Sequence, residues 1–166
     1  MTDPSTAPAP DRDVRITHVA DAPRDIVFHV WTDPEEVARW WGPHGFDVPR
    51  ESVNIELRPG GRYDMVMKLV DPEIASGMGA EVGVEFSDSA EVVEVKEGEL
   101  LVIRSEPQPQ IGLPEPITTR VEFADSADGR TEITIISGPH TGQMAPNAKA
   151  GFAQQLEKLD SLLASR

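Results

Sequence analysis

Proton transfer near neutral pH is the chemistry best suited to the four histidines of this chain, His18, His29, His44 and His140. They lie far apart in the sequence, and none belongs to a metal-binding motif such as His-Glu-x-x-His, so no metal site is predicted. His44 directly follows a predicted helix, in a loop, where a histidine can act as an acid or a base. The simpler interpretation, which we favour, is an exposed loop histidine without a catalytic role.

A second acid–base candidate is Tyr63, which alternation places on the inward face of a predicted strand. Its hydroxyl could hydrogen-bond a bound carbonyl group, although the simpler interpretation is a strand tyrosine with its tip at the surface. The chain has no cysteine and no Gly-x-Ser-x-Gly motif, so it lacks the usual thiol and serine nucleophiles. We therefore assign no catalytic residue and keep His44 and Tyr63 as weak candidates.

Two glycine-rich segments fail the tests for cofactor-binding motifs. Gly77 to Gly83 has the spacing Gly-x-Gly-x-x-x-Gly, and no strand–helix–strand unit is predicted around it, so a dinucleotide site is not indicated. Gly60-Gly61 is typical of a turn, because the lysine and hydroxyl of a phosphate-binding loop are missing. The sequence thus predicts no cofactor.

Large apolar side chains offer a different kind of chemistry, the binding of apolar molecules. Tryptophans bury large areas and anchor cores more often than they contact ligands, so we expect Trp31 in the core. Of Trp40 and Trp41, we expect one in the core and one beside a cavity. Met65 and Met67 are flexible enough to line a pocket of irregular shape, and ordinary core filling is the alternative.

Composition limits the classes of partner. The 166 residues fit one domain, which we place at residues 13–166 after a disordered tail at residues 1–12. A net charge of -14 without a basic cluster argues against binding of nucleic acids and anionic membranes. The chain has no apolar run of about 20 residues and does not begin like a signal peptide. We expect a cytoplasmic protein.

The elements that must position these residues follow from local patterns. Alternation predicts a strand from Val14, and Pro23 and the run Asp33-Pro34-Glu35-Glu36 mark the starts of two helices. Gly42-Pro43 ends the second helix. Further strands are predicted around residues 53–57, 63–69, 90–96, 100–104, 117–123 and 131–135, with a turn at Asp128-Gly129. Residues 71–83 are predicted as an irregular segment, and residues 106–116 as a proline-rich loop.

A long amphipathic helix is predicted from about Pro146 to the end. Phe152, Leu156, Leu159 and Leu163 recur on one face of it. Antiparallel strands with helices on one face make an α+β domain.

Several motifs together carry a family resemblance. They are Ala22-Pro23-Arg24, Val30 to Glu35, Ala38 to Pro43 and Leu57 to Tyr63. With the order of elements, they make the chain resemble the helix-grip fold of the START and birch-pollen-allergen superfamily (SRPBCC). The most similar branch is that of the C-terminal domain of the heat-shock-chaperone ATPase activator. The resemblance implies a curved antiparallel sheet wrapped around a long C-terminal helix, with two short helices between strands 1 and 2.

This chain departs from that branch in two places. The last helix usually opens with Gly-Trp in the branch, whereas Gly151-Phe152 stands here, so a smaller ring alters the expected cavity. The segment 71–87 is longer than the usual connection, and could form an extra hairpin or a lid at the cavity opening.

The resemblance implies a cavity between sheet and C-terminal helix that binds a hydrophobic small molecule, such as a polyketide-like natural product or intermediate, for sequestration, transport or self-resistance. The expected ligand-binding residues are Trp41, Phe46, Met65, Met67, Phe86, Ile103, Thr119, Val121, Phe152, Leu156 and Leu159.

Two alternatives stay open. A polyketide cyclase or aromatase could act in the same cavity with few catalytic groups, because orientation alone lowers a barrier. Activation of a chaperone ATPase is the other, although the family's separate N-terminal chaperone-binding domain has no room in this chain. We expect a monomer or homodimer, with no metal.

Overall fold

The structure is a computed structural model that describes residues 13–109 and 113–166. Its strands are β1 (Val14–Ala20), β2 (Phe46–Asp47), β3 (Asn54–Ile55), β4 (Arg62–Leu69), β5 (Glu85–Lys96), β6 (Leu100–Ser105), β7 (Ile117–Asp125) and β8 (Thr131–Gly138). Its helices are α1 (Arg24–Thr32), α2 (Pro34–Trp40), α3 (Pro72–Met78) and α4 (Ala145–Ala164), with 3-10 turns at Arg50–Ser52 and Ala127–Gly129.

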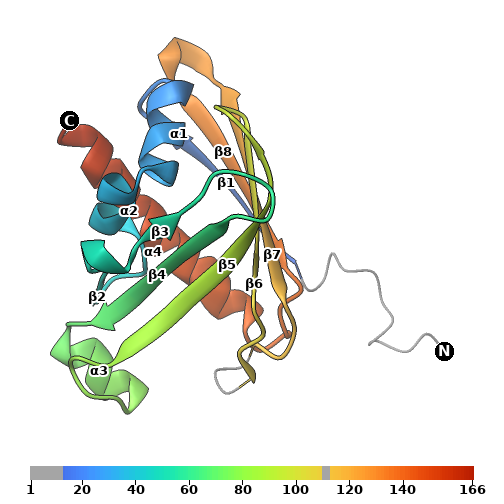
Figure 1. Cartoon of the computed structure of the whole chain (residues 1–166). Coiled ribbons are helices and arrows are strands. Elements are labelled where there is room, and N and C mark those ends of the chain that lie inside the picture. Colours follow the sequence, from blue (N-terminus) through green and yellow to red (C-terminus); the bar gives the residue numbers. More distant parts are fainter. Residues whose placement is uncertain (1–12, 110–112) are drawn as a thin grey trace.

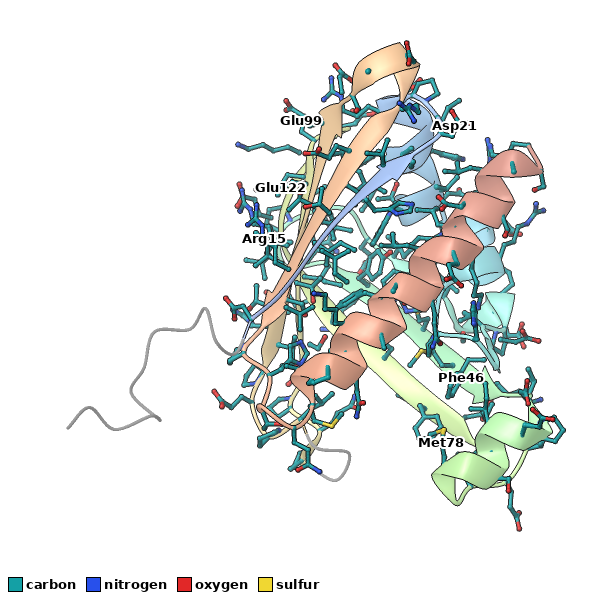
Figure 2. The ribbon with its side chains drawn as sticks, turned by 180° about the vertical axis from the view of Figure 1, so that it is seen from behind. Arg15, Asp21, Phe46, Met78, Glu99 and Glu122 are labelled. Atoms are coloured by element: carbon teal, nitrogen blue, oxygen red, sulfur yellow. The ribbon has the colours of Figure 1, made fainter. Side chains whose placement is uncertain are left out.

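All strands belong to one antiparallel sheet in the order β1-β8-β7-β6-β5-β4-β2, and β3 also pairs with β4. The sheet curves, and α1, α2 and α4 lie on the same side of it (Figure 1). Figure 2 shows Arg15, Glu99 and Glu122 on the opposite side, pointing away from α4. This is the helix-grip arrangement predicted from the sequence.

The two short helices form where their capping residues predict. The Asp33 side chain accepts a hydrogen bond from the Glu36 backbone N–H at 3.2 Å, and Pro34 occupies the first turn of α2. The helix ends when Trp41 turns to an extended conformation. Gly42 then takes a φ of +88°, in the left-handed region that favours glycine.

The α4 helix buries the stripe of leucines that the sequence places on one face. Leu156, Leu159, Leu162 and Leu163 are buried in its second half, where the helix packs on β1 and α2. Phe152, one turn before Leu156, stays partly exposed. The second half of α4 is therefore the part that the core holds.

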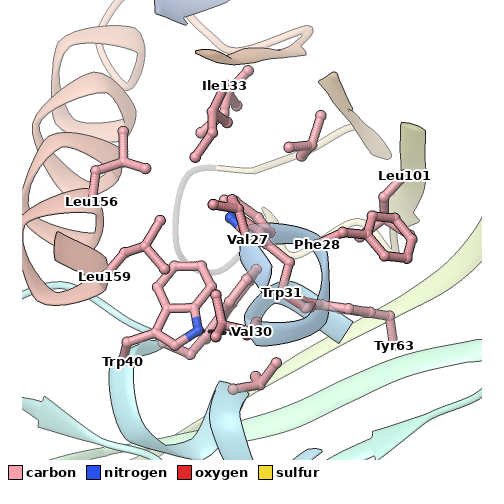
Figure 3. Close-up of a cluster of buried hydrophobic side chains, with 14 of the residues drawn as sticks. Val27, Phe28, Val30, Trp31, Trp40, Tyr63, Leu101, Ile133, Leu156 and Leu159 are labelled. Carbon is pink, nitrogen blue, oxygen red and sulfur yellow. Dashed lines mark hydrogen bonds between the residues drawn. The ribbon is translucent and has the colours of Figure 1, made fainter. Parts of the chain in front are cut away.

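Aromatic rings form the centre of the core (Figure 3). The ring centroid of Trp31 lies 4.7 Å from that of Trp40, 5.8 Å from that of Trp41 and 5.9 Å from that of Phe123. The ring planes meet edge to face, the geometry that aromatic pairs prefer. Trp40 is fully buried and its Nε1 donates to the Val30 carbonyl at 2.8 Å, so its role is structural.

The segment predicted as irregular, residues 71–83, contains α3, so that prediction is wrong. Asp71 accepts hydrogen bonds from the backbone N–H groups of Glu73 and Ile74, and Gly79 ends the helix in a left-handed conformation. Ala75 packs with Phe46 and Leu69 in a small second cluster. Figure 2 shows Phe46 and Met78 at this corner of the molecule.

The strands also differ in extent from the prediction. β5 begins at Glu85 instead of Ala90, and only Asn54–Ile55 of the predicted strand 53–57 joins the sheet. The predicted tail at residues 1–12 lies outside the described residues, and the assignment of 13–166 as one domain stays a prediction. Within residues 13–109 and 113–166, no helix is both long and apolar enough to cross a membrane.

Candidate ligand-binding cavity

A cavity of about 320 Å³ lies between the first half of α4 and the sheet. Trp31 of α1 and Trp41 after α2 form one wall, and β6, β7 and β8 form another. Met144, Ala148 and Gly151 contribute from α4 and the residue before it. The loop after β6 also reaches the cavity, which thus draws on most of the fold's elements.

Several of the expected ligand-binding residues meet in this cavity. They are Trp41, Met67, Ile103, Thr119, Val121 and Phe152. Phe152, which stands in place of the tryptophan usual in the related branch, is partly exposed and lines the cavity. Whether these residues contact a ligand stays a prediction.

The other expected residues lie outside the cavity lining. Phe46 and Phe86 contact one another in the cluster beside α3, with ring centroids 5.9 Å apart. Met65, Leu156 and Leu159 are buried in the main core. Strand alternation identifies the covered face of a sheet, but the packing of α1, α2 and α4 decides which part of that face is hollow.

No residue of α3 lines the cavity. The helix packs at the β2 corner, where its Ile74 lies against Gly45. The segment 71–87 contributes to the cavity lining only through Ser87, at its end. A lid formed by this segment is therefore not supported by its position.

Asp88 is a polar cavity residue that the sequence analysis missed. It is partly exposed, and its Oδ2 accepts a hydrogen bond from Trp41 Nε1 at 3.0 Å. Burial raises the pKa of the Asp88 carboxyl, the Trp41 hydrogen bond acts in the opposite direction, and the nearby Asp64 charge adds to the rise. Asp88 occupies every second position with Phe86 and Ala90 along β5, and this alternation in the sequence could have placed it on the inner face of the sheet.

A buried chain of polar side chains lines the β7–β8 wall; its Thr119 was expected there, whereas Ser137 and His140 were missed. Thr119 Oγ1 lies 3.0 Å from Ser137 Oγ, which lies 3.2 Å from His140 Nε2. Burial lowers the pKa of His140, and the charge of Asp13 opposes this shift. Ser137 continues the inward alternation of Ile133 and Ile135, so its place was readable from the sequence.

The two weak catalytic candidates do not line the cavity. His44 is exposed, and its Nε2 lies 3.1 Å from Glu157 Oε2. Tyr63 is 1% exposed, and its hydroxyl donates to the Trp31 carbonyl at 2.6 Å. The interpretation of Tyr63 as a residue with its tip at the surface is therefore wrong. Burial raises the pKa of Tyr63 well above its usual value.

Two nitrogen atoms of cavity residues are buried without a hydrogen-bond partner among the described residues, Trp31 Nε1 and Gln155 Nε2. Trp31 is 2% exposed and Gln155 7%. Buried polar atoms in folded proteins normally have partners, so these two nitrogen atoms are exceptions that call for an explanation.

A second hollow of about 580 Å³ lies beside α1, away from α4, with a more polar lining. His29 and Asp33 line it, and together with Glu36 they each offer one ligand atom within 4.8 Å of the others. Asp33 already caps α2, and Glu36 Oε1 accepts from Arg166 Nη1 at 2.7 Å. Asp33 Oδ2 and Glu36 Oε1 thus have protein partners, whereas Glu36 Oε2 is buried without one among the described residues. Acidic groups often gather in this way without an ion, and we assign no metal to them.

Comparisons with known proteins agree with this architecture. The family described as Activator of Hsp90 ATPase homolog 1-like protein matches residues 21–164. A search of curated proteins found no match to the chain.

Solved structures share the fold. A protein from Arthrobacter aurescens is 20% identical with a TM-score of 0.75, over 96% of this chain and 90% of its own. One from Nitrosomonas europaea is 22% identical with a TM-score of 0.72, over 94% of this chain and 96% of its own. DynU16, a protein in the dynemicin biosynthetic locus, is 20% identical with a TM-score of 0.62, over 93% of this chain and 48% of its own. At these identities the likeness shows the fold alone.

Proposed function

This chain belongs to the Activator of Hsp90 ATPase homolog 1-like family, and from its cavity we propose that it binds a hydrophobic small molecule between the sheet and α4. The observation that carries the proposal is the cavity itself, whose walls are mostly apolar and include two tryptophan rings. Sites for small molecules are typically concave and apolar, with a few polar groups that orient the ligand. Asp88, Ser137 and His140 supply such groups here.

We further propose a polyketide-like natural product or intermediate as the ligand, held for sequestration, transport or self-resistance. The likeness in fold to DynU16 supports this choice only as an analogy. The cytoplasmic location predicted from the sequence belongs to the same proposal.

Fluorescence titration tests the proposal directly, because Trp31 and Trp41 line the cavity and report on what enters it. We expect a saturable change with members of a panel of aromatic and polyene compounds. An absence of saturable binding across the panel would count against the proposal.

A pair of variants at Gly151 supplies the matched control. Gly151 lines the cavity inside α4, and a Cβ added there meets no atom within 4 Å. Gly151→Ala and Gly151→Leu should therefore each stabilise the helix by roughly 0.5–1 kcal/mol, because glycine is a poor helix former. The leucine side chain takes up part of the cavity of about 320 Å³, whereas the alanine methyl takes up little, so we expect the leucine variant to bind ligand more weakly than the alanine variant. Equal binding by both variants would place the ligand elsewhere.

An enzymatic role is the second candidate, and the contact between Ser137 and His140 favours it. A histidine whose pKa is lowered by burial is neutral at pH 7 and can accept a proton. If the protein acts as a cyclase or aromatase, we expect His140→Gln to reduce turnover at least about 100-fold, as for loss of a general base. A His44→Ala/Tyr63→Phe double variant should keep its activity. Full activity of His140→Gln together with lost activity of the double variant would instead assign the role of general base to His44 or Tyr63.

Chaperone ATPase activation also stays a candidate, because the family takes its name from it. The test is an ATPase assay of the cognate chaperone with this protein added. Stimulation would support this role, and an unchanged rate would oppose it.

A further inference from the structure

We propose that the ligand is an uncharged, oxygen-bearing ring compound, and that one of its carbonyl-type oxygens accepts a hydrogen bond from Trp31 Nε1. This inference rests on the proposed function and specifies the chemistry of the same cavity. It follows from the partners of the three indole N–H groups, from Gln155 in the lining of the same cavity and from the charges of the lining.

The three tryptophans use their indole N–H groups differently. Trp40 donates to the Val30 carbonyl at 2.8 Å, and Trp41 donates to Asp88 Oδ2 at 3.0 Å. Trp31 is 2% exposed and lines the cavity, yet its Nε1 has no acceptor within the described part of the chain. An indole nitrogen is only a donor, so the group that satisfies it must carry an acceptor.

Gln155 adds a second polar group to the same cavity. It is 7% exposed, and its Nε2 lacks a partner among the residues that the structure describes. An amide can present its nitrogen or its oxygen, so Gln155 can pair with a carbonyl or with a neighbouring hydroxyl. Together, Trp31 and Gln155 fit a ketone, a quinone or a phenolic ketone.

The charges of the lining exclude an anionic ligand. Asp88 and Glu106 line the cavity, and no lysine or arginine does so within residues 13–109 and 113–166. Lys158 lies close by, but its Nζ donates to the carbonyl oxygens of Trp41 and Phe46 and it is not part of the lining. A carboxylate or phosphate would lose its hydration without gaining a cation, which is costly.

Three compounds with the same ring system test the need for a neutral acceptor and the exclusion of an anion separately. Fluorene has no acceptor, 9-fluorenone has one neutral acceptor, and fluorene-9-carboxylate is an anion. Calorimetric titration should give fluorenone about tenfold tighter binding than fluorene, the size expected for one satisfied donor. The carboxylate should bind more weakly than either.

The Trp31→Phe variant should reduce the preference for fluorenone to about twofold or less, because it keeps an aromatic ring and removes the donor. Trp40→Phe is the matched control, since its N–H bonds the protein backbone outside the cavity. Trp40→Phe should keep the preference.

Nuclear magnetic resonance supplies a readout that does not depend on a variant. The chain has 3 tryptophans, so three indole N–H signals can be followed. We expect the Trp31 signal alone to shift downfield with fluorenone and to shift less with fluorene.

The outcomes separate the two proposals. Equal binding of fluorene and fluorenone, a preference that survives Trp31→Phe, or tight binding of the carboxylate would overturn this inference and leave ligand binding intact. If none of the three probes binds and the wider panel also fails, the proposed function itself is overturned.

Discussion

Tyr63 shows how a single buried hydroxyl joins the sheet to α1. The carbonyl groups in the last turn of a helix have no partner within the helix, and Trp31 lies in the last turn of α1. The Tyr63 hydroxyl supplies that partner at 2.6 Å. This bond holds Trp31 in place from behind, and so fixes one wall of the cavity without entering it.

Removal of this hydroxyl should destabilise the fold and spare the cavity. We expect Tyr63→Phe to lower the free energy of unfolding by about 1–3 kcal/mol, because the Trp31 carbonyl is left buried without its partner. Urea unfolding measures this loss, and titration of the same variant checks that ligand affinity changes little. Full stability combined with lost binding or activity would assign Tyr63 a direct role instead.

His140 should make stability depend on pH. Its pKa is lowered in the folded state, so the unfolded chain binds more protons between that lowered pKa and the usual value of 6.5. Stability conferred by neutral His140 is therefore complete above about pH 6.5 and falls as the pH drops through this window. Below the pKa of His140 in the folded protein, the loss of unfolding free energy that this residue causes stops increasing.

Urea unfolding between pH 7.5 and pH 5 gives the measurement for wild type and His140→Gln. The difference in unfolding free energy between the two should shrink as the pH falls. A difference that stays constant with pH would show that His140 does not titrate in this way.

Elements with strong local signals were predictable from the sequence, and elements decided by long-range packing were not. The Asp-Pro-Glu run at residues 33–35 correctly predicted the start of α2, whereas the same run at Asp71-Pro72-Glu73 lies in the segment that was predicted as irregular. The cap at Asp71 begins a short helix there, and Gly79 ends it. In the cavity, alternation found Thr119 and Val121, but could not reveal that α3 would enclose Phe46 in a separate cluster.

The α3 cap can be tested on its own. Asp71→Ala removes the acceptor of the Glu73 and Ile74 N–H groups, at 2.8 and 3.3 Å, and should cost about 0.5–2 kcal/mol. Hydrogen exchange should rise in residues 72–78 and stay unchanged in the cavity walls. Asp33→Ala, at the cap of α2, is the comparison that should instead loosen the residues next to Trp41.

At the scale of the whole molecule, α4 is held unevenly along its length. Its second half buries four leucines, and Arg166 next to its end pairs with Glu36 at 2.7 Å. In its first half, Ala148, Gly151 and Phe152 are exposed or partly exposed and face the cavity. Segments with few buried contacts open locally at low cost, so the first half is the more labile part.

Hydrogen exchange along α4 should reveal this difference. We expect amides of residues 148–152 to exchange faster than those of residues 159–163, and a bound ligand to slow only the first group. Uniform protection along the helix would mean that α4 moves as one unit.

The first half of α4 forms one wall of the cavity and buries fewer side chains than the leucine-packed second half. We expect an outward displacement of this first half to widen the cavity at a lower energetic cost than a displacement of the second half. The volume of about 320 Å³ then describes the cavity with α4 in this one position. Compounds larger than this space should still bind, at an energetic cost that grows with the displacement of the first half of α4.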